Sequence, residues 1–301
     1  MWTPQFDTFV APARTRPQPW RLLVGFLVIA AAYLIGFLVI LVGLIATMGL
    51  DPAQAYLSSL EAEGGTPTLV VLMLAMFAAP FLGTLLAARL LHGRGPSTLF
   101  GRGLVRGFVT AMVIAALVYA AVTLLLPAPF EPVPGVPLPM FLSFLPLALV
   151  VLLIQTGAEE VVFRGYLQSQ LAARFRSPLV WMLVPALGFA LLHGDPTGSG
   201  DKVWLILPPL VFGLIAADLT RVTGSIGAAW GLHFLNNASA ILILSLDGNL
   251  SGLALYRTPF GPEDLSLSDP LIWQDMTVTV IVWACIRLWL ARGKVQPNPA
   301  E

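Results

Sequence analysis

Eight long apolar runs divide this chain, and they constrain its fold more than any other feature of the sequence. They cover residues 22–49, 68–91, 105–127, 141–167, 178–193, 203–220, 225–246 and 271–291. A helix needs about 20 mainly apolar residues to cross the hydrocarbon core of a bilayer. In lipid, helices also satisfy their own backbone polar groups. The runs therefore predict an all-α fold: a polytopic integral membrane helix bundle with about eight transmembrane helices.

The composition supports the same fold class. Hydrophobic residues make up 57% of the chain and charged residues 11%, whereas soluble domains carry about 25% charged residues. The formal net charge is zero, so we expect membrane lipid around the protein and no nucleic-acid partner. We predict one transmembrane unit over residues 22–291, flanked by an N-terminal tail (residues 1–21) and a C-terminal tail (residues 292–301).

The segments between the runs alternate in charge, and this alternation orients the bundle. Basic side chains gather in every second loop and near both chain ends, at Arg14, Arg16, Arg21, Arg94, Arg102, Arg106, Arg174, Arg176, Arg221, Arg287, Arg292 and Lys294. The alternate loops hold Asp51, Glu61, Glu63, Glu131, Asp195 and Asp201. Positively charged loops remain on the cytoplasmic side of a membrane. We therefore predict that both termini lie in the cytoplasm.

A cluster of charges lies at the end of the fourth run, in the stretch Glu159-Glu160-Val161-Val162-Phe163-Arg164. Ionisable side chains inside a membrane span are costly, and they mark functional sites or paired charges. Glu160 and Arg164 are four residues apart, so they share a helix face and can form a structural ion pair. Glu159 is turned by about 100° from Glu160 and has no partner within its own helix. Glu159 is therefore the candidate for chemistry.

Two histidine motifs could supply partners for Glu159. Phe189-x-x-x-His193 ends the fifth run, and His233-x-x-x-Asn237 lies in the seventh run with both polar side chains on one helix face. Packing or interhelical hydrogen bonding would explain either motif taken alone. The helical rise places Glu159 and His233 roughly 12–14 Å from the cytoplasmic ends of their spans. His193 reaches the same depth if the fourth helix continues through residues 168–175 and the fifth begins outside the bilayer.

This set of side chains suits the hydrolysis of a peptide bond. A carboxylate with a neighbouring imidazole can activate water as a general base, and an imidazole with an Asn amide can donate hydrogen bonds to an oxyanion. The same nitrogens and oxygens are also zinc ligands, although the H-E-x-x-H signature is absent. The remaining histidine, His92, lies beside Arg94 at the end of a span, where we expect an interfacial, non-catalytic role. Asp218 and Arg221 are expected to form a structural pair.

Taken together, the three motifs resemble those of the CAAX protease and bacteriocin-processing family (CPBP, or Abi) of intramembrane proteases, which includes the type II CAAX prenyl endopeptidases. The family motifs are EExxxR, FxxxH and HxxxN/D, and this chain carries all three in the same order. The resemblance covers about residues 140–240. It implies that Glu159 and His193 activate water, that His233 and Asn237 stabilise the oxyanion, and that Glu160 and Arg164 support them.

The resemblance also implies an activity and its alternatives. The implied activity is an intramembrane endopeptidase that cleaves a membrane-associated peptide or protein substrate. We expect metal-free chemistry, with one zinc ion bound by Glu159, His193 and His233 as the alternative. Two other functions stay open. One is a non-proteolytic membrane scaffold or bacteriocin-immunity protein of the same fold, and the other is a proton-coupled transporter, because Glu and His side chains also relay protons.

Overall fold

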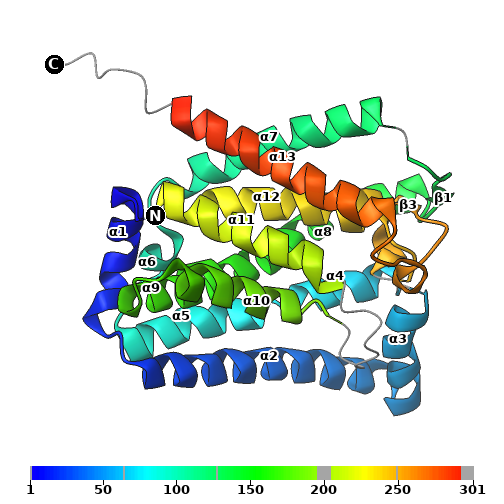
Figure 1. The fold of residues 1–301 in the computed structure, drawn as a ribbon. Coiled ribbons are helices and arrows are strands. Elements are labelled where there is room, and N and C mark those ends of the chain that lie inside the picture. Colours follow the sequence, from blue (N-terminus) through cyan, green and yellow to red (C-terminus); the bar gives the residue numbers. More distant parts are fainter. Residues whose placement is uncertain (1, 64, 127, 195–204, 249, 293–301) are drawn as a thin grey trace.

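Helices lie side by side along the length of the molecule (Figure 1). The computed structural model describes residues 2–63, 65–126, 128–194, 205–248 and 250–292. In chain order the α-helices are α1 (Pro4–Val10), α2 (Pro19–Met48), α3 (Leu50–Glu63), α4 (Pro67–Ala75), α5 (Ala78–His92), α6 (Ser97–Phe100), α7 (Leu104–Leu125), α8 (Leu138–Glu160), α9 (Ser169–Arg174), α10 (Val184–Leu191), α11 (Leu207–Thr223), α12 (Gly227–Ala238) and α13 (Pro270–Arg292).

Several short segments complete the described chain. Three are π-helical, namely η2 (Val161–Gln168), η3 (Leu179–Leu183) and η5 (Ser239–Ile243), and three are 3₁₀ turns, namely η1 (Ala11–Thr15), η6 (Ser251–Leu253) and η7 (Pro262–Asp264). The strands β1 (Val133–Pro134), β2 (Leu244–Ser245) and β3 (Tyr256–Arg257) form a small sheet in the order β1-β3-β2. In this sheet β3 pairs antiparallel with β1 and parallel with β2.

The structure confirms an all-α membrane helix bundle. Within the described residues, five helical segments are long and apolar enough to cross a membrane: Pro19–Met48, Pro67–His92, Leu104–Leu125, Leu138–Arg174 and Pro270–Arg292. The other three predicted runs form shorter helical segments, namely η3 with α10, α11, and α12 with η5, and these pack on one another and on α8. Residues 203–204, which begin the sixth run, and the preceding loop with Asp195 and Asp201 lie outside the described residues.

The fourth span continues well beyond its apolar run. Helices α8, η2 and α9 form one continuous segment of 37 residues, Leu138–Arg174. This result confirms the expectation that the fourth helix extends through residues 168–174. The π-helical part, η2, begins directly after Glu160. Single π-helical turns within α-helices frequently lie at functional sites.

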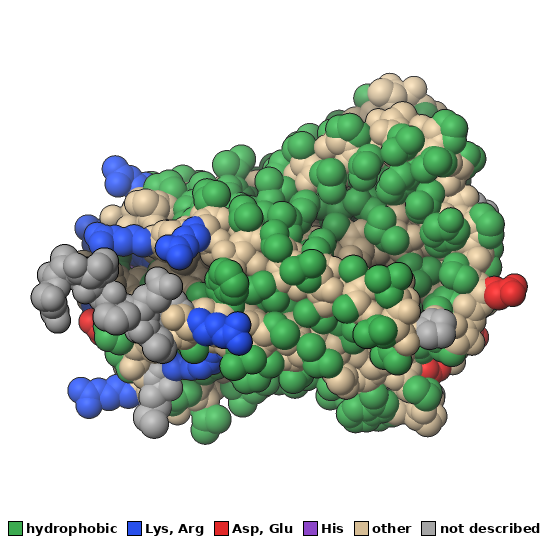
Figure 2. Space-filling view, turned by 90° about the horizontal axis from the view of Figure 1, so that it is seen from above, with side chains coloured by type: hydrophobic (Ala, Val, Ile, Leu, Met, Phe, Trp, Pro, Cys, Tyr) green, Lys and Arg blue, Asp and Glu red, His purple; other side chains and the backbone are tan. Residues whose placement is uncertain are grey.

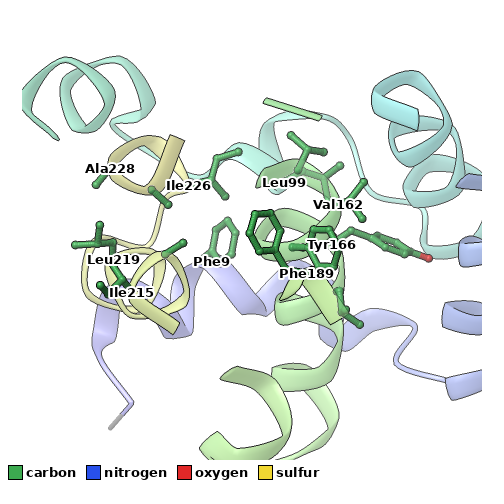
Figure 3. Packing of buried hydrophobic residues seen from close by; sticks show 14 of the residues in the cluster. Phe9, Leu99, Val162, Tyr166, Phe189, Ile215, Leu219, Ile226 and Ala228 are labelled. Atoms are coloured by element: carbon green, nitrogen blue, oxygen red, sulfur yellow. The ribbon is translucent and has the colours of Figure 1, made fainter. Parts of the chain in front are cut away.

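The N-terminal segment packs against the bundle, although the sequence predicted a tail over residues 1–21. Helix α1 buries Phe6, Phe9 and Val10, and the Thr3 hydroxyl donates a hydrogen bond to the backbone oxygen of Arg221 at the end of α11. Figure 3 shows Phe9 in the same cluster as Tyr166 of η2. The amphipathic pattern of α1 explains this packing, because its aromatic side chains leave the solvent.

Small residues let the central helices approach closely. A Cβ atom on Gly231 of α12 would lie 2.1 Å from the backbone oxygen of Phe108 in α7, and one on Gly227 would lie 2.2 Å from that of Leu104. Small residues spaced by four are typical of helix contacts within membranes, because they allow two backbones to touch. Helix α12 is thereby held between α7 and α8, which places its polar residues inside the bundle.

The charges separate toward the two ends of the molecule. Figure 2 shows Lys and Arg side chains gathered at one end and Asp and Glu side chains chiefly at the other, with hydrophobic side chains over the surface between them. The apolar windows of α2 and α7 are only 11% buried within the protein. A surface of this kind suits contact with lipid, and its charge asymmetry agrees with the pattern that the loops predicted.

Candidate active site

The ion pair that the sequence predicted is present and buried. Arg164 Nη1 lies 2.8 Å from Glu160 Oε1, and the two side chains are 1% and 0% exposed. The guanidinium carbon of Arg164 lies 4.8 Å from the ring centroid of Phe189, a cation–π contact. Arg164 Nη2 also donates to the backbone oxygen of Gly213 at 3.4 Å. The pair therefore ties the η2 segment to α10 and α11.

His233 lies between the two glutamates. Its Nδ1 atom is 2.8 Å from Glu160 Oε1, and its Nε2 atom is 3.3 Å from Glu159 Oε2. Glu159 thus finds on α12 the partner that its own helix does not offer. The structure brings Glu159, Glu160, Arg164 and His233 into one buried cluster, and the Glu159 side chain keeps 14% of its surface exposed.

The contacts of His233 indicate that one proton lies between its Nε2 atom and Glu159. Glu160 is paired with Arg164 and can only accept, so the Nδ1 atom of His233 carries a hydrogen. In a neutral imidazole the Nε2 atom would then be an acceptor facing another acceptor, Glu159 Oε2. A proton on either Nε2 or Glu159 removes this conflict. Either position of the proton also leaves the four side chains with no net charge.

Asn237 reaches the cluster through a residue that the sequence analysis did not single out. The Asn237 Nδ2 atom donates to Gln155 Oε1 at 3.0 Å. Gln155 is buried on α8 one turn before Glu159, so the two side chains share a helix face. A glutamine four residues before Glu159 in an apolar run was the signal that could have identified it.

A tryptophan fixes the position of α12 against α8. Trp230 Nε1 donates to Thr156 Oγ1 at 3.1 Å. A Cβ atom on Gly157 would lie 2.4 Å from the Trp230 ring, so only glycine admits the indole at this point. Trp230 precedes His233 by one turn, and Thr156 and Gly157 precede Glu159 on α8. The contact therefore sets the register between the two catalytic candidates.

His193 lies next to this cluster without touching Glu159. Its Nδ1 atom is 2.8 Å from the backbone oxygen of Phe189, and its ring is 4.4 Å from the Phe189 ring, centroid to centroid. The Phe189 ring also contacts His233, and the centroids of these two rings are 5.8 Å apart. A carbonyl oxygen only accepts, so Nδ1 is protonated and Nε2 of the neutral ring is an acceptor. No hydrogen bond or ion pair joins His193 to Glu159 among the described residues.

The described residues do not form a metal-binding group. No three His, Cys, Asp or Glu side chains among them are arranged to hold a metal ion together. His233 directs both ring nitrogens at the glutamates, and His193 is held by the Phe189 backbone. Glu159, His193 and His233 are thus not grouped as a metal site among the described residues. We therefore assign no step of the reaction to a metal.

The other singled-out residues have structural contacts. His92 is buried at the end of its span, and its ring forms hydrogen bonds with the Tyr166 hydroxyl at 2.9 Å and the Arg16 backbone oxygen at 3.0 Å. Asp218 and Arg221 form the expected ion pair at 2.6 Å, and Asp218 also pairs with Arg287. These contacts join helix ends and lie outside the Glu159 cluster.

Comparison with known proteins places the cluster in a family. Residues 140–239 match the family model described as "Type II CAAX prenyl endopeptidase Rce1-like". A protein from Bacillus subtilis (strain 168), "Uncharacterized protein YyaK", is 26% identical over 298 residues, which are 94% of this chain and 96% of that protein. No solved structure matches the chain. Since the matched segment runs from α8 through α12 and contains all three motifs, residues 140–239 are a domain of the Rce1-like type II CAAX prenyl endopeptidase family.

Proposed function

We propose that this chain is an intramembrane endopeptidase that hydrolyses a peptide bond of a membrane-associated peptide or protein. The contact between Glu159 and His233 inside a membrane-spanning bundle carries the proposal. Apart from its 3.3 Å ion-pair contact with His233 Nε2, the buried Glu159 Oε2 atom makes no hydrogen bond with a described residue. A buried acceptor without a hydrogen bond lowers stability, and a catalytic role is one explanation for such a group in a folded protein. It is available to a water molecule that attacks a substrate.

The proposed reaction begins with the shared proton on His233. Glu159 is then a carboxylate that takes a proton from water while the water oxygen adds to the scissile carbonyl carbon. The Nε2–H group of His233 and the amide of Asn237 donate hydrogen bonds to the carbonyl oxygen as it gains charge. As the C–N bond breaks, the proton on Glu159 passes to the leaving nitrogen. Water is thus divided between the new carboxylate and the new amine.

The remaining polar residues have positioning roles in this scheme. Glu160 accepts from His233 Nδ1 and so directs the Nε2 atom at Glu159. Arg164 balances the charge of Glu160, and Gln155 holds the Asn237 side chain. His193 offers the unprotonated Nε2 atom as a second acceptor for the attacking water. Glu159 lies on the spanning helix α8, and this location favours a substrate that is associated with the membrane.

Replacing Asn237 with alanine is expected to lower turnover by about 100- to 1000-fold, because one oxyanion donor is lost. Substrate binding should change little, so the effect should appear in kcat rather than in KM. Asn237→Asp should be similarly severe, since a carboxylate has no proton to donate. Steady-state cleavage of a membrane-anchored peptide measures both constants. A wild-type kcat in Asn237→Asp would remove Asn237 from the oxyanion role and favour metal ligation at this position.

The orientation of the bundle is proposed from its charges. The arginine-rich end is placed in the cytoplasm, and we propose a bacterial inner membrane with the active site facing that side. In a Cys285→Ser background, Ser58→Cys on α3 should react with a membrane-impermeant maleimide in intact cells. Arg176→Cys, exposed at the other end of the molecule, should react only after the membrane is opened. The reverse labelling pattern would invert the topology.

A further inference from the structure

A second concave site lies at the arginine-rich end of the bundle, away from the Glu159 cluster. It is an open cavity of about 410 Å³ between α7, α13 and the start of α12, and we call it the α7–α13 cavity. Its polar lining comes mainly from Arg102, Arg106, Thr110, Ser225 and Arg287. None of the catalytic candidates contributes to it. The face of the molecule that Figure 2 shows carries basic side chains at this end.

The cavity has an excess of positive charge. Arg102 and Arg106 are exposed and have no ion pair or hydrogen bond with any described residue. Arg102 lies in the turn before α7 and Arg106 lies in the first turn of that helix, and both line the cavity. Arg287 is compensated by Asp218, and none of the described residues that line the cavity is acidic. Two unpaired guanidinium groups therefore face a space that can hold an anion.

The geometry of α7 adds to this preference for an anion. The helix begins at Leu104, directly after Arg102 and Gly103, and no side chain caps its N-terminus. Uncapped backbone N–H groups carry a partial positive charge at a helix start. Guanidinium groups match phosphate oxygens in geometry as well as in charge. A phosphate group fits this combination of guanidinium groups and helix N–H groups.

The walls of the cavity are apolar and continue onto the lipid-facing surface. Ala111, Ile286 and Leu290 line its inner side. On the outer faces of α7 and α13, Val105, Leu288 and Trp289 are exposed large hydrophobic residues. The site therefore offers charge at one end of the bundle and an apolar path along two spanning helices. A free phosphate ion would use the charge alone, whereas a lipid uses both.

We infer that the α7–α13 cavity binds the phosphate headgroup of an anionic phospholipid, with the acyl chains lying along α7 and α13. Basic pockets between transmembrane helices on the cytoplasmic side are typical sites for anionic lipid headgroups. The inference uses residues outside the proposed catalytic machinery, so it stands whether or not the chain is a protease.

The test compares two charge-matched double variants of the full chain purified in detergent. Native mass spectrometry measures the binding of phosphatidylglycerol against zwitterionic phosphatidylcholine. The wild-type protein should prefer phosphatidylglycerol, and Arg102→Gln/Arg106→Gln should weaken that binding by roughly 25-fold, at about fivefold for each arginine. Arg89→Gln/Arg174→Gln removes two exposed arginines of α5 and α9 that do not line the cavity. This control should bind the lipid as the wild type does.

Three results would overturn the inference. The first is equal binding of the two lipids by the wild-type protein, and the second is an unchanged affinity in Arg102→Gln/Arg106→Gln. The third is an equal loss in both double variants, which would indicate general surface charge instead of a site. Inorganic phosphate in large excess serves as the soluble arm. If inorganic phosphate binds the wild-type protein as tightly as phosphatidylglycerol does, the acyl chains contribute nothing, the cavity is a free-phosphate site and the lipid assignment is wrong.

Discussion

Glu159→Gln is expected to lower peptide-bond cleavage by about 100- to 10,000-fold, the usual contribution of a general acid–base group. Glutamine keeps the size of the side chain and its contacts with α12, but it cannot take a proton from water at neutral pH. The bundle should remain folded, because glutamine also removes a buried, unsatisfied carboxylate. Cleavage rate and thermal unfolding temperature, both measured in detergent, separate loss of chemistry from loss of structure.

The control for this variant is Glu131→Gln. Glu131 is an exposed glutamate between α7 and α8, outside the cluster, and its replacement should leave the cleavage rate unchanged. If Glu159→Gln cleaves at the wild-type rate while remaining folded, Glu159 is not the base. If the cleavage rate falls by the same factor in Glu131→Gln as in Glu159→Gln, the loss reflects a general effect of charge on substrate binding.

Arg164→Ala is expected to destabilise the protein by about 3–5 kcal/mol, the cost of removing one partner from a buried ion pair. The variant leaves Glu160 as an uncompensated buried carboxylate, and it removes the cation–π contact with Phe189. His233 then faces two acidic groups without the balancing guanidinium. Thermal unfolding of the detergent-purified protein measures the effect.

Two further variants show whether burial of the charge causes this loss. Glu160→Gln/Arg164→Met removes both charges and should recover much of the stability, because no unpaired charge remains in the interior. Arg14→Ala breaks an ion pair with Asp7 in which the side chains are 41% and 51% exposed, so it should cost at most about 1 kcal/mol. An Arg164→Ala protein as stable as the Arg14→Ala protein would contradict the structural role of the buried pair.

The features that the sequence predicted correctly depend on local spacing. The apolar runs follow from the length of a bilayer-spanning helix, and each described run is helical. The Glu160–Arg164 pair follows from a separation of four residues on one helix. Such features need no knowledge of which helices are neighbours.

The features that the sequence did not predict depend on contacts between helices. His233 meets both glutamates because Gly157 and Trp230 set the register of α8 against α12, and no local pattern gives that register. The hydrogen bond between His193 Nδ1 and the backbone oxygen of Phe189 depends on the end of α10 at Leu191, which the sequence did not predict. The packing of α1 likewise depends on contacts of Phe6, Phe9 and Val10 with other helices, which its own sequence does not specify.

The most direct test of the account is the appearance of new peptide termini in water enriched in heavy oxygen. Purified wild-type protein and Glu159→Gln are each reconstituted in lipid vesicles with a mixed library of single-span membrane peptides, and the products are identified by mass spectrometry. The account predicts cleaved peptides with heavy oxygen in the new carboxylate for the wild type, and their loss with Glu159→Gln. If wild type and Glu159→Gln yield the same products, or if neither yields any while the wild type carries a proton flux that Glu159→Gln abolishes, the protease account is contradicted.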